Sequence, residues 1–271
     1  MQRSEVDEKP FFSIVMPVFN GEAFIGEALK SILNQNFYRL EIIIIDGGST
    51  DSTAAIVEAI NSPKIMYQCG KDFGLNHAVN KGVIAARGKF ILWLNSDDFL
   101  YPGSLQKVHD ILDDSNIDVL YGNTNHVDIN GVVMRSHGAM DFDYKTLVNK
   151  KNYIPTQSCF FRKDILSHVG LFDCSLVWCG DWDMWKKIAA TKKYKFHFCN
   201  ETIAAWRHHL DTITSRGGSR ELYQRSLEVS RNSRKYSTQF ISSIEMQNLP
   251  YLVVGFLGLR ELWRKLKRTH A

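Results

Sequence analysis

The sequence predicts an α/β fold: an open, mostly parallel, twisted sheet with helices on both faces, followed by a helical C-terminal extension. Strand and helix patterns alternate four times within the first hundred residues, which favours parallel strands joined by helical crossovers. The strands lack polar alternation, as expected where both faces of a sheet are covered. With 271 residues, 44% of them hydrophobic, the chain can bury a full core.

The first strand is predicted at 13–18, "SIVMPV", which carries no charge. Asn20 is the predicted N-cap of a helix with an apolar face from Phe24 to Leu33. The second strand, 42–45, is four isoleucines and ends at Asp46. This half is completed by a helix near 51–60, a strand at 64–69, a helix at 75–86 and a strand at 89–94.

The alternation weakens after residue 98. The pattern predicts a helix at 104–112, a strand at 117–123, strands and loops through 124–155, a short helix after 158–166 and a helix at 180–194. From residue 216 onward the pattern is helical and basic. No Pro/Gly-rich linker divides the chain, so we expect one domain at 1–215 and a basic helical extension at 216–271.

Charge and cysteine content narrow the function classes. The net charge is +4, yet residues 216–271 hold 11 of the 33 Lys and Arg and 4 of the 29 Asp and Glu, a net of +7 that leaves −3 for 1–215. The basic segment suits an anionic surface or is simply a solvated helix face. Five cysteines without CxxC spacing, and no secretory signal, favour a reduced, cytoplasmic location without zinc.

The segment "ILWLNSDDFL" places two adjacent carboxylates, Asp97 and Asp98, at the end of an apolar strand. In open α/β sheets ligands bind beyond the carboxyl ends of the strands. Carboxylates are hard ligands for Mg²⁺ or Mn²⁺, and such ions keep open positions for substrate phosphates. The alternative is an ordinary turn in which Asp98 caps the next helix.

Two further segments point to the same sheet edge. In "IDGGSTD", Gly47 and Gly48 permit a sharp turn, and Asp46 can accept hydrogen bonds from ligand hydroxyls or a base N–H. It is neither a Walker sequence nor GxGxxG, and a plain strand-to-helix turn explains it equally well. "DFGLNHAVNKG" then forms a polar helix that precedes the strand with the acidic pair.

Together, "SIVMPVFN", "IIIIDGGSTD" and "DFGLNHAVNKGVIAARGKFILWLNSDD" resemble the family 2 glycosyltransferases, which have the Rossmann-like GT-A fold. The resemblance covers at least residues 12–100 and is closest to the enzymes of bacterial polysaccharide assembly. It implies inverting transfer from a nucleotide diphospho-sugar, most often a UDP-sugar, with Mn²⁺ or Mg²⁺. Residues 1–215 would then be the catalytic domain.

The resemblance also implies roles for residues at the donor side. Pro17 lies where the first strand backs the nucleotide base, and Asp46 matches the first residue of an Asp-Asp pair. Gly47 stands where many relatives have the second Asp, often a contact to uracil or ribose. Asp72 falls in the loop that usually closes on the base. Asp97 and Asp98 match the acidic metal motif, with Asp97 facing the ribose and Asp98 holding the metal.

The acceptor hydroxyl needs a separate carboxylate as general base. The family's Glu-Asp acceptor motif appears in "CGDWDMWKK" as Gly180-Asp181, which makes Asp181 the predicted base. The alternative is that Asp181 caps a helix whose first turn carries Asp183. In "AWRHHLDTITS" the resemblance places His209 near the diphosphate and metal, with His208 as the alternative.

Residues 249–259, "LPYLVVGFLGL", are too short to span a bilayer, and "RELWRKLKR" follows. An apolar and then basic pattern over 249–268 suits peripheral contact with an anionic membrane, on its inner face. Packing against the domain, or against a second copy in a homodimer, explains the pattern equally well. No nucleic-acid-binding motif accompanies the charge.

These observations predict a cytoplasmic glycosyltransferase that adds a sugar to a glycan or lipid-linked acceptor. One alternative is a nucleotidyltransferase of similar topology, but "PVFNGEAF" offers no cation for a phosphate loop. Another is a catalytically silent protein that binds nucleotide-sugars or acts as a scaffold.

Overall fold

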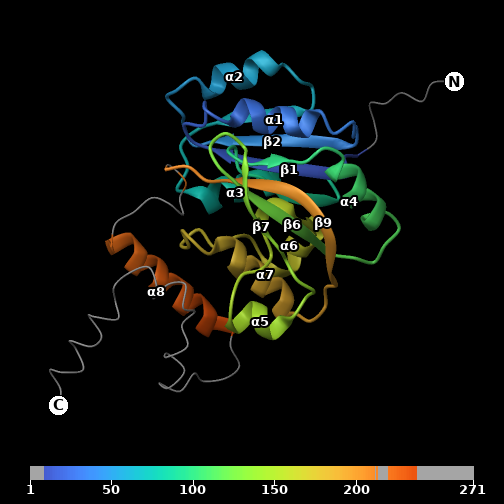
Figure 1. Cartoon of the computed structure of the whole chain (residues 1–271), viewed down its shortest axis with the longest axis vertical. Helices are drawn as coiled ribbons and strands as arrows, with labels where there is room; N and C mark the ends of the chain where they lie inside the picture. The colour runs from blue at the N-terminus through green and yellow to red at the C-terminus, as the bar shows by residue number, and fades with distance from the viewer. Residues whose placement is uncertain (1–8, 211, 213–218, 237–271) are drawn as a thin grey trace.

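The computed structural model describes residues 9–210, 212 and 219–236 (Figure 1). One mixed sheet forms its centre, in the order β3-β2-β1-β4-β8-β6-β9-β5, and β7 pairs with β6 off this path. The strands are β1 (Phe12–Val18), β2 (Leu40–Asp46), β3 (Ile65–Cys69), β4 (Phe90–Trp93), β5 (Phe99–Leu100), β6 (Val119–Val127), β7 (Val133–His137), β8 (Cys159–Arg162) and β9 (Phe196–Arg207).

The first half of the sheet is parallel and confirms the predicted strand–helix alternation. β1 pairs in parallel with β2 and β4, and β2 with β3. The register sets Val18 beside Asp46 and Asp46 beside Cys69, so the carboxyl ends of β1, β2 and β3 are level. The second half is mixed: β8 is antiparallel to β4 and β6, whereas β9 runs parallel to β6.

Helices cover both faces of this sheet (Figure 1). They are α1 (Ile25–Leu33), α2 (Thr53–Ile60), α3 (Leu75–Ala85), α4 (Ser104–Leu112), α5 (Tyr144–Asn149), α6 (Leu166–Val169), α7 (Gly180–Ala190) and α8 (Ser219–Tyr236). None of the helices within the described residues is long and apolar enough to cross a membrane.

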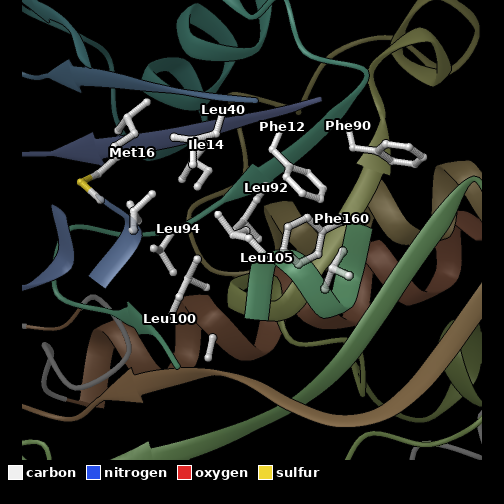
Figure 2. Close-up of a cluster of buried hydrophobic side chains, with 14 of the residues drawn as sticks. Phe12, Ile14, Met16, Leu40, Phe90, Leu92, Leu94, Leu100, Leu105 and Phe160 are labelled. Atoms are coloured by element: carbon white, nitrogen blue, oxygen red, sulfur yellow. The ribbon is translucent and has the colours of Figure 1, made fainter. Parts of the chain in front are cut away.

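Alternate residues of the central strands feed two hydrophobic layers. Phe12, Ile14 and Met16 of β1 pack with residues of α1 and α4 on one face. Figure 2 shows these three side chains together with Leu105 of α4 and Phe160 of β8. The intervening Val15 joins Ile43, Ile91 and residues of α3 and α7 on the other face. Burial on both faces explains why β1 and β2 show no polar alternation.

The predicted N-cap at Asn20 is wrong. Asn20 has a left-handed backbone, φ 52°, and its side-chain oxygen accepts a hydrogen bond from the Thr50 backbone N–H (2.9 Å). The side chain therefore ties the loop after β1 to the loop after β2, and α1 begins at Ile25. The sequence reading also missed the twelve-residue strand β9.

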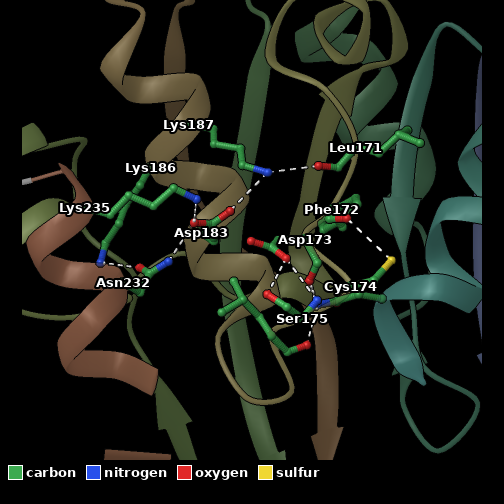
Figure 3. A network of polar contacts seen from close by, with 12 residues as sticks. Leu171, Phe172, Asp173, Cys174, Ser175, Asp183, Lys186, Lys187, Asn232 and Lys235 are labelled. Carbon is green, nitrogen blue, oxygen red and sulfur yellow. Dashed lines mark hydrogen bonds and ion pairs between the residues drawn. The ribbon is translucent and has the colours of Figure 1, made fainter. Parts of the chain in front are cut away.

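The C-terminal helix α8 is joined to α7 through buried polar contacts (Figure 3). Asp183, fully buried, accepts hydrogen bonds at one oxygen from Asn232 (2.7 Å), Lys235 (3.0 Å) and Tyr236 (2.9 Å). The buried Lys186 ammonium donates to Asn232 (2.8 Å). The part of the predicted extension that forms α8 therefore packs against α7.

Candidate active site

A cleft of about 1090 Å³ opens beyond the carboxyl ends of β1, β2 and β4. This is where an open α/β sheet places its ligand. Its walls come from the ends of β1 and β9, the loops after β2, β3 and β4, the turn before β8, the start of α7 and one side of α8. Among its lining residues are Pro17, Phe19, Gly47, Asp72, Asp97, His126, Thr156, Trp178, Asp181, Trp206, His209, Arg225 and Val229.

Asp97 and His209 meet in this cleft from two distant segments. The His209 Nε2 lies 3.0 Å from the Asp97 Oδ2, and both side chains are partly exposed, 12% and 25% respectively. Asp97 follows β4, and His209 follows β9, which β5 and β6 hold in place. The Phe24 ring packs against the imidazole with 4.8 Å between centroids. The pair gives the cleft one carboxylate and one imidazole side by side.

Asp98 does not face the cleft. Its side chain is 1% exposed and accepts hydrogen bonds from the Arg207 backbone N–H (2.9 Å) and the Asn95 amide (3.3 Å). Burial, and then the charge of Asp97, raise the pKa of Asp98 well above its usual value. Asp97 therefore lies at the cleft, whereas Asp98 anchors β9 to the loop. Which of the two would bind a metal ion stays a prediction.

Asp46 is also buried inside the fold, and a ligand contact at this residue stays a prediction. One carboxylate oxygen accepts the backbone N–H groups of Gly48 (2.9 Å) and Ser49 (2.7 Å), and the other accepts the Tyr67 hydroxyl (2.6 Å). Its side chain is fully buried and does not line the cleft. Asp46 closes the turn after β2, because its oxygens are used by the turn and by β3.

Pro17 and Asp72 line the cleft, and their contact with a nucleotide base stays a prediction. Beside them Phe19 is 62% exposed, which leaves an aromatic ring open to a ligand. The sequence reading missed this residue, although an aromatic directly after an apolar strand was a visible signal.

Asp181 lies at the start of α7 and lines the same cleft as Asp97 and His209. Its Oδ2 accepts hydrogen bonds from Thr156 Oγ1 (2.7 Å) and from the Asn152 amide (3.0 Å). Burial raises the pKa of Asp181, and these donors oppose the rise because they favour the ionised form. A carboxylate that is partly desolvated and held in one orientation is suited to accept a proton.

Gly180, where the family pattern has Glu, has a packing reason in this chain. A Cβ at residue 180 would lie 2.2 Å from the Asn76 amide nitrogen. That amide donates hydrogen bonds to the backbone oxygens of Asp173 and Leu176, each at 2.9 Å. Asn76 thereby fixes the loop before α7, and only glycine at 180 leaves it room.

Beneath Asp97, the buried Arg207 guanidinium holds the loop that carries this residue. It donates to the backbone oxygens of Asp97 (3.0 Å) and Ile129 (2.7 Å) and pairs with Glu27 (2.7 Å). The next residue, His208, does not line the cleft and is hydrogen-bonded to the lining residue His126 (2.6 Å). Of the two histidines considered from the sequence, only His209 lines the cleft.

The α8 helix contributes Arg225 and Val229 to the cleft wall, which the sequence reading did not foresee. The Glu228 carboxylate on the same helix accepts three backbone N–H groups, from Val177 (2.9 Å), Trp178 (2.7 Å) and Cys179 (2.9 Å). These residues directly precede Gly180 and Asp181, so α8 holds the loop that leads to the candidate base.

Asp97 and His209, the candidate metal ligands in the cleft, fit an open divalent-metal site. Within the described ranges no group of three or more His, Cys, Asp and Glu is placed to hold a metal. Asp97 and His209 would supply two ligands, and a diphosphate and water would fill the remaining positions. Mg²⁺ typically binds one or two carboxylates together with substrate phosphates, and imidazole is a suitable ligand for transition metals.

Comparison with known proteins identifies the family. The model for glycosyl transferase family 2 matches residues 13–180, more than half of the chain. The chain belongs to glycosyl transferase family 2. The match extends from β1 to the start of α7, so it includes the segments that carry Asp72, Asp97 and the loop before Asp181.

Two relatives show how far the similarity to other family 2 members reaches. An uncharacterized glycosyltransferase of Rickettsia felis is 27% identical over 257 residues, covering 90% of this chain and 41% of the relative. A PGL/p-HBAD biosynthesis glycosyltransferase of Mycobacterium tuberculosis is 32% identical over 185 residues, covering 64% of this chain and 68% of the relative. The chain thus spans about two fifths of the length of the Rickettsia felis relative.

Solved family structures share the fold. The S. aureus protein TarS, in complex with UDP-GlcNAc, superposes with a TM-score of 0.65 at 20% identity, covering 82% of this chain and 66% of TarS. The mannosyltransferase PcManGT from Pyrobaculum calidifontis, in complex with GDP-Man and Mn²⁺, gives 0.61 at 17% identity, covering 95% of this chain and 72% of that chain. The α/β fold of GT-A type predicted from the sequence is confirmed.

Proposed function

We propose that this chain is an inverting, metal-dependent glycosyltransferase that moves a sugar from a nucleotide diphospho-sugar to an acceptor hydroxyl. The expected donor is a UDP-sugar. The observation that carries the proposal is the position of Asp181. Its partly desolvated, oriented carboxylate lines the same cleft as the Asp97–His209 pair. A donor-binding group and a candidate base in one cleft are what displacement at a sugar carbon requires.

In the proposed reaction the acceptor oxygen attacks the anomeric carbon from the side opposite the diphosphate. The new C–O bond forms as the bond to the diphosphate oxygen breaks, so the configuration inverts and a nucleoside diphosphate leaves. The hydroxyl proton passes to the Asp181 carboxylate as the bond forms. Thr156 and Asn152 keep that carboxylate oriented throughout.

Asp97 and His209 would hold Mn²⁺ or Mg²⁺, which when bound neutralises charge developing on the leaving diphosphate. Pro17, Phe19 and Asp72 would surround the nucleotide base at the other side of the cleft. Two solved structures support this division, since TarS was solved with UDP-GlcNAc and PcManGT with GDP-Man and Mn²⁺.

The proposed acceptor is a growing surface glycan. A lipid-linked oligosaccharide is the substrate that would test this most directly. The mycobacterial relative's assignment to PGL/p-HBAD biosynthesis supports a glycolipid type of acceptor. Residues 249–268 lie outside the described residues, and we propose that they hold the chain at the inner face of an anionic membrane, where such acceptors are found.

The decisive experiment measures release of nucleoside diphosphate from a panel of sugar donors, with and without Mn²⁺. Donor-dependent release that requires the metal is expected for the full chain. Asp181→Asn should retain donor binding by calorimetry and lose turnover roughly 10²–10⁴-fold, the range of general-base contributions. Loss of donor binding instead, or unchanged turnover, would reject Asp181 as the base.

A further inference from the structure

Basic residues gather on two neighbouring helices, α5 and the last two turns of α8. The segments 144–152 and 229–236 contain six Lys and Arg residues and no Asp or Glu. All six residues are exposed: Lys145, Lys150, Lys151, Arg231, Arg234 and Lys235. Lys235 is bound to Asp183 (3.0 Å), and the other five form what we call the basic patch.

The two helices are held together by the residues beneath them. The Trp182 ring N–H of α7 donates to the Leu147 backbone oxygen of α5 (2.7 Å). The Lys186 ammonium lies 3.5 Å from the centroid of the Trp182 ring and donates to Asn232 of α8 (2.8 Å). The two helices are in contact, and the end of α8 lies beside α5 (Figure 1). The cations of both helices are therefore held close to one another.

The patch faces away from the core on both helices. On α8, Arg231 and Arg234 are three residues apart and so share one side, whereas the buried Asn232 points to α7. On α5, the lysine pair at 150–151 directly follows the last helical residue. The N-cap of α5, Asp143, is an acid, but its carboxylate accepts a backbone N–H at the other end of the helix (2.7 Å). Positive charge therefore predominates at this surface.

The basic patch borders the active-site cleft on the side of Asp181. The lysine pair at 150–151 directly precedes Asn152, whose amide donates to the Asp181 carboxylate (3.0 Å). On α8, Arg225 and Val229 line the cleft within two turns of Arg231. A surface in contact with the patch would therefore lie beside the part of the cleft where an acceptor hydroxyl must arrive.

We propose that the basic patch docks the folded domain onto the anionic headgroups of a membrane, with the Asp181 side of the cleft next to the bilayer. This contact is separate from the one proposed for residues 249–268. It goes beyond the proposed function and rests on that function only for the lipid-linked acceptor. The tail would hold the chain at the membrane, and the patch would set the orientation of the cleft.

A bilayer fits this surface in charge and in the course of the chain. Cations close to anionic lipid each favour binding, and the patch presents five of them. The described part of α8 ends at Tyr236, beside the patch, and residues 237–248 could span roughly 40 Å if extended. Both contacts can therefore reach one surface. Stable peripheral binding commonly takes two signals, one apolar and one basic. The apolar residues of 249–259 would supply one signal and the patch the other.

The test removes the charges of the patch in the full chain. Lys145→Gln, Lys150→Gln and Lys151→Gln are combined in one variant, and Arg231→Gln and Arg234→Gln in a second. Sedimentation with mixed phosphatidylcholine and phosphatidylglycerol vesicles measures binding. At roughly fivefold per cation, binding should fall roughly 100-fold in the first variant and roughly 25-fold in the second. UDP affinity in the presence of Mn²⁺ should hold in both, because the cleft is unaltered.

The matched control combines Lys30→Gln, Lys89→Gln and Lys107→Gln. These lysines are exposed and do not line the cleft. Two of them are on α1 and α4, which pack on the sheet face opposite α7. The control removes the same charge from other surfaces and should bind vesicles nearly as the unaltered chain does. An equal loss in the control and in the α5 variant would mean that only net charge matters, which rejects the patch.

Chemical footprinting tests the orientation without any substitution. Lysines of the free and the vesicle-bound full chain are acetylated and located by mass spectrometry. Lys150 and Lys151 should lose reactivity on the vesicles, whereas Lys30 and Lys89 should react equally in both states. Unchanged reactivity of Lys150 and Lys151 in the bound chain would reject docking through the patch, even if a variant fails to fold.

The remaining outcomes separate this inference from the proposed function. If the unaltered chain ignores the vesicles but binds single-stranded RNA through the patch, membrane docking is rejected in favour of a nucleic-acid surface. Donor binding and metal-dependent release of nucleoside diphosphate would then still support the glycosyltransferase proposal. Vesicle binding through the patch without any such release would reject that proposal and leave the docking surface standing.

Discussion

At the scale of residues, the neighbours Asp97 and Asp98 show how one step along the chain separates two roles. Asp97 faces the cleft beside His209, whereas Asp98 is buried against the Arg207 backbone. We expect Asp97→Asn to remove the Mn²⁺-dependent part of donor affinity. Asp98→Asn should keep that affinity, because an amide resembles the neutral acid that burial favours at this position.

Calorimetric titration of UDP and UDP-sugars with and without Mn²⁺ checks both variants. Thermal unfolding serves as the control that each variant is folded. If Asp98→Asn loses the metal-dependent affinity and Asp97→Asn keeps it, Asp98 is the metal ligand and Asp97 is not.

The acid limb of the pH–activity profile offers a second test at this scale. Asp181 must be ionised to accept a proton, and its pKa is raised, so activity should be lost as pH falls through a value above the usual 3.8. Thr156 donates a hydrogen bond that favours the ionised form. Thr156→Val should therefore move the acid limb upward by about one pH unit.

The profile of turnover number against pH, measured at saturating donor, checks this shift. Thr50→Val is a suitable control, since Thr50 is exposed in the loop after β2 and does not line the cleft. An acid limb at the same pH in Thr156→Val and in the unaltered chain would contradict the assignment of Asp181 as the titrating base.

Whether the position of each of these residues could be predicted from the sequence depends on how far along the chain its partners lie. Asp97, Asp181 and His209 belong to sequence motifs that the family resemblance indicates, and all three line the cleft. The choice between Asp97 and Asp98 was not predictable, because it depends on which side chain meets the Arg207 N–H 109 residues later. The burial of Asp46 was not predictable for a similar reason, since its partner Tyr67 lies in another strand.

At the scale of elements, β9 and α8 complete the site. β9 was missed because Asn200, Glu201 and Thr202 interrupt its apolar pattern, and its pairing with β6 shifts register in the same region. Its stability as a strand comes from long-range pairing with β6 rather than from local preference. Without β9, neither His209 nor the Arg207 support for Asp97 would reach the cleft.

The α8 helix should affect turnover through Glu228, which holds the loop before Asp181. Glu228→Gln keeps one acceptor oxygen but turns an NH₂ toward one of the backbone N–H groups of residues 177–179. The loop before Asp181 should loosen, and the turnover number should fall roughly tenfold, the cost of one lost charged hydrogen bond. UDP affinity should stay unchanged, because the Asp97–His209 side of the cleft is untouched.

Glu221→Gln is the matched control, since Glu221 is an exposed glutamate on the same helix. Steady-state kinetics and UDP calorimetry on both variants separate positioning from general destabilisation. Equal turnover numbers for the two variants would show that α8 does not position the loop.

At the scale of the whole molecule, the site lies where the two halves of the sheet meet. The parallel half supplies Asp72 and Asp97, and the mixed half supplies His209 through β9 and Asp181 through the chain after β8. The parallel half was predictable because its strands and helices alternate locally. The mixed half was not, because its strand order, β8-β6-β9, follows from contacts between distant segments.

Membrane contact by residues 249–268 is a prediction for the whole chain. Its basic and apolar residues should bring the protein down with vesicles that contain anionic lipid, but not with neutral phosphatidylcholine vesicles. High salt should weaken this binding, because it screens surface charge. A chain shortened to 1–236 should no longer sediment with the vesicles while still binding UDP, and unchanged sedimentation would place the contact elsewhere.

The boundary of the folded domain is tested by comparing chains 1–236 and 1–215. A division at residue 215 follows the charge pattern, but it removes Asn232, Lys235 and Tyr236 from the buried carboxylate of Asp183. It also removes Asn232 from the Lys186 ammonium, whose pKa burial lowers to about 7. Removing one side of a buried charged network costs about 3–5 kcal/mol, so 1–215 should unfold at a clearly lower temperature.

Thermal unfolding followed by circular dichroism measures this difference, and Asp183→Asn in the longer chain is the intermediate case. That variant keeps α8 but weakens its attachment, so it should melt between the two chains. Because Glu228 leaves with α8, the 1–215 chain should also lose the order of the loop before Asp181. If chains 1–215 and 1–236 melt at the same temperature, α8 does not stabilise the domain, and the residues up to β9 are sufficient for the fold.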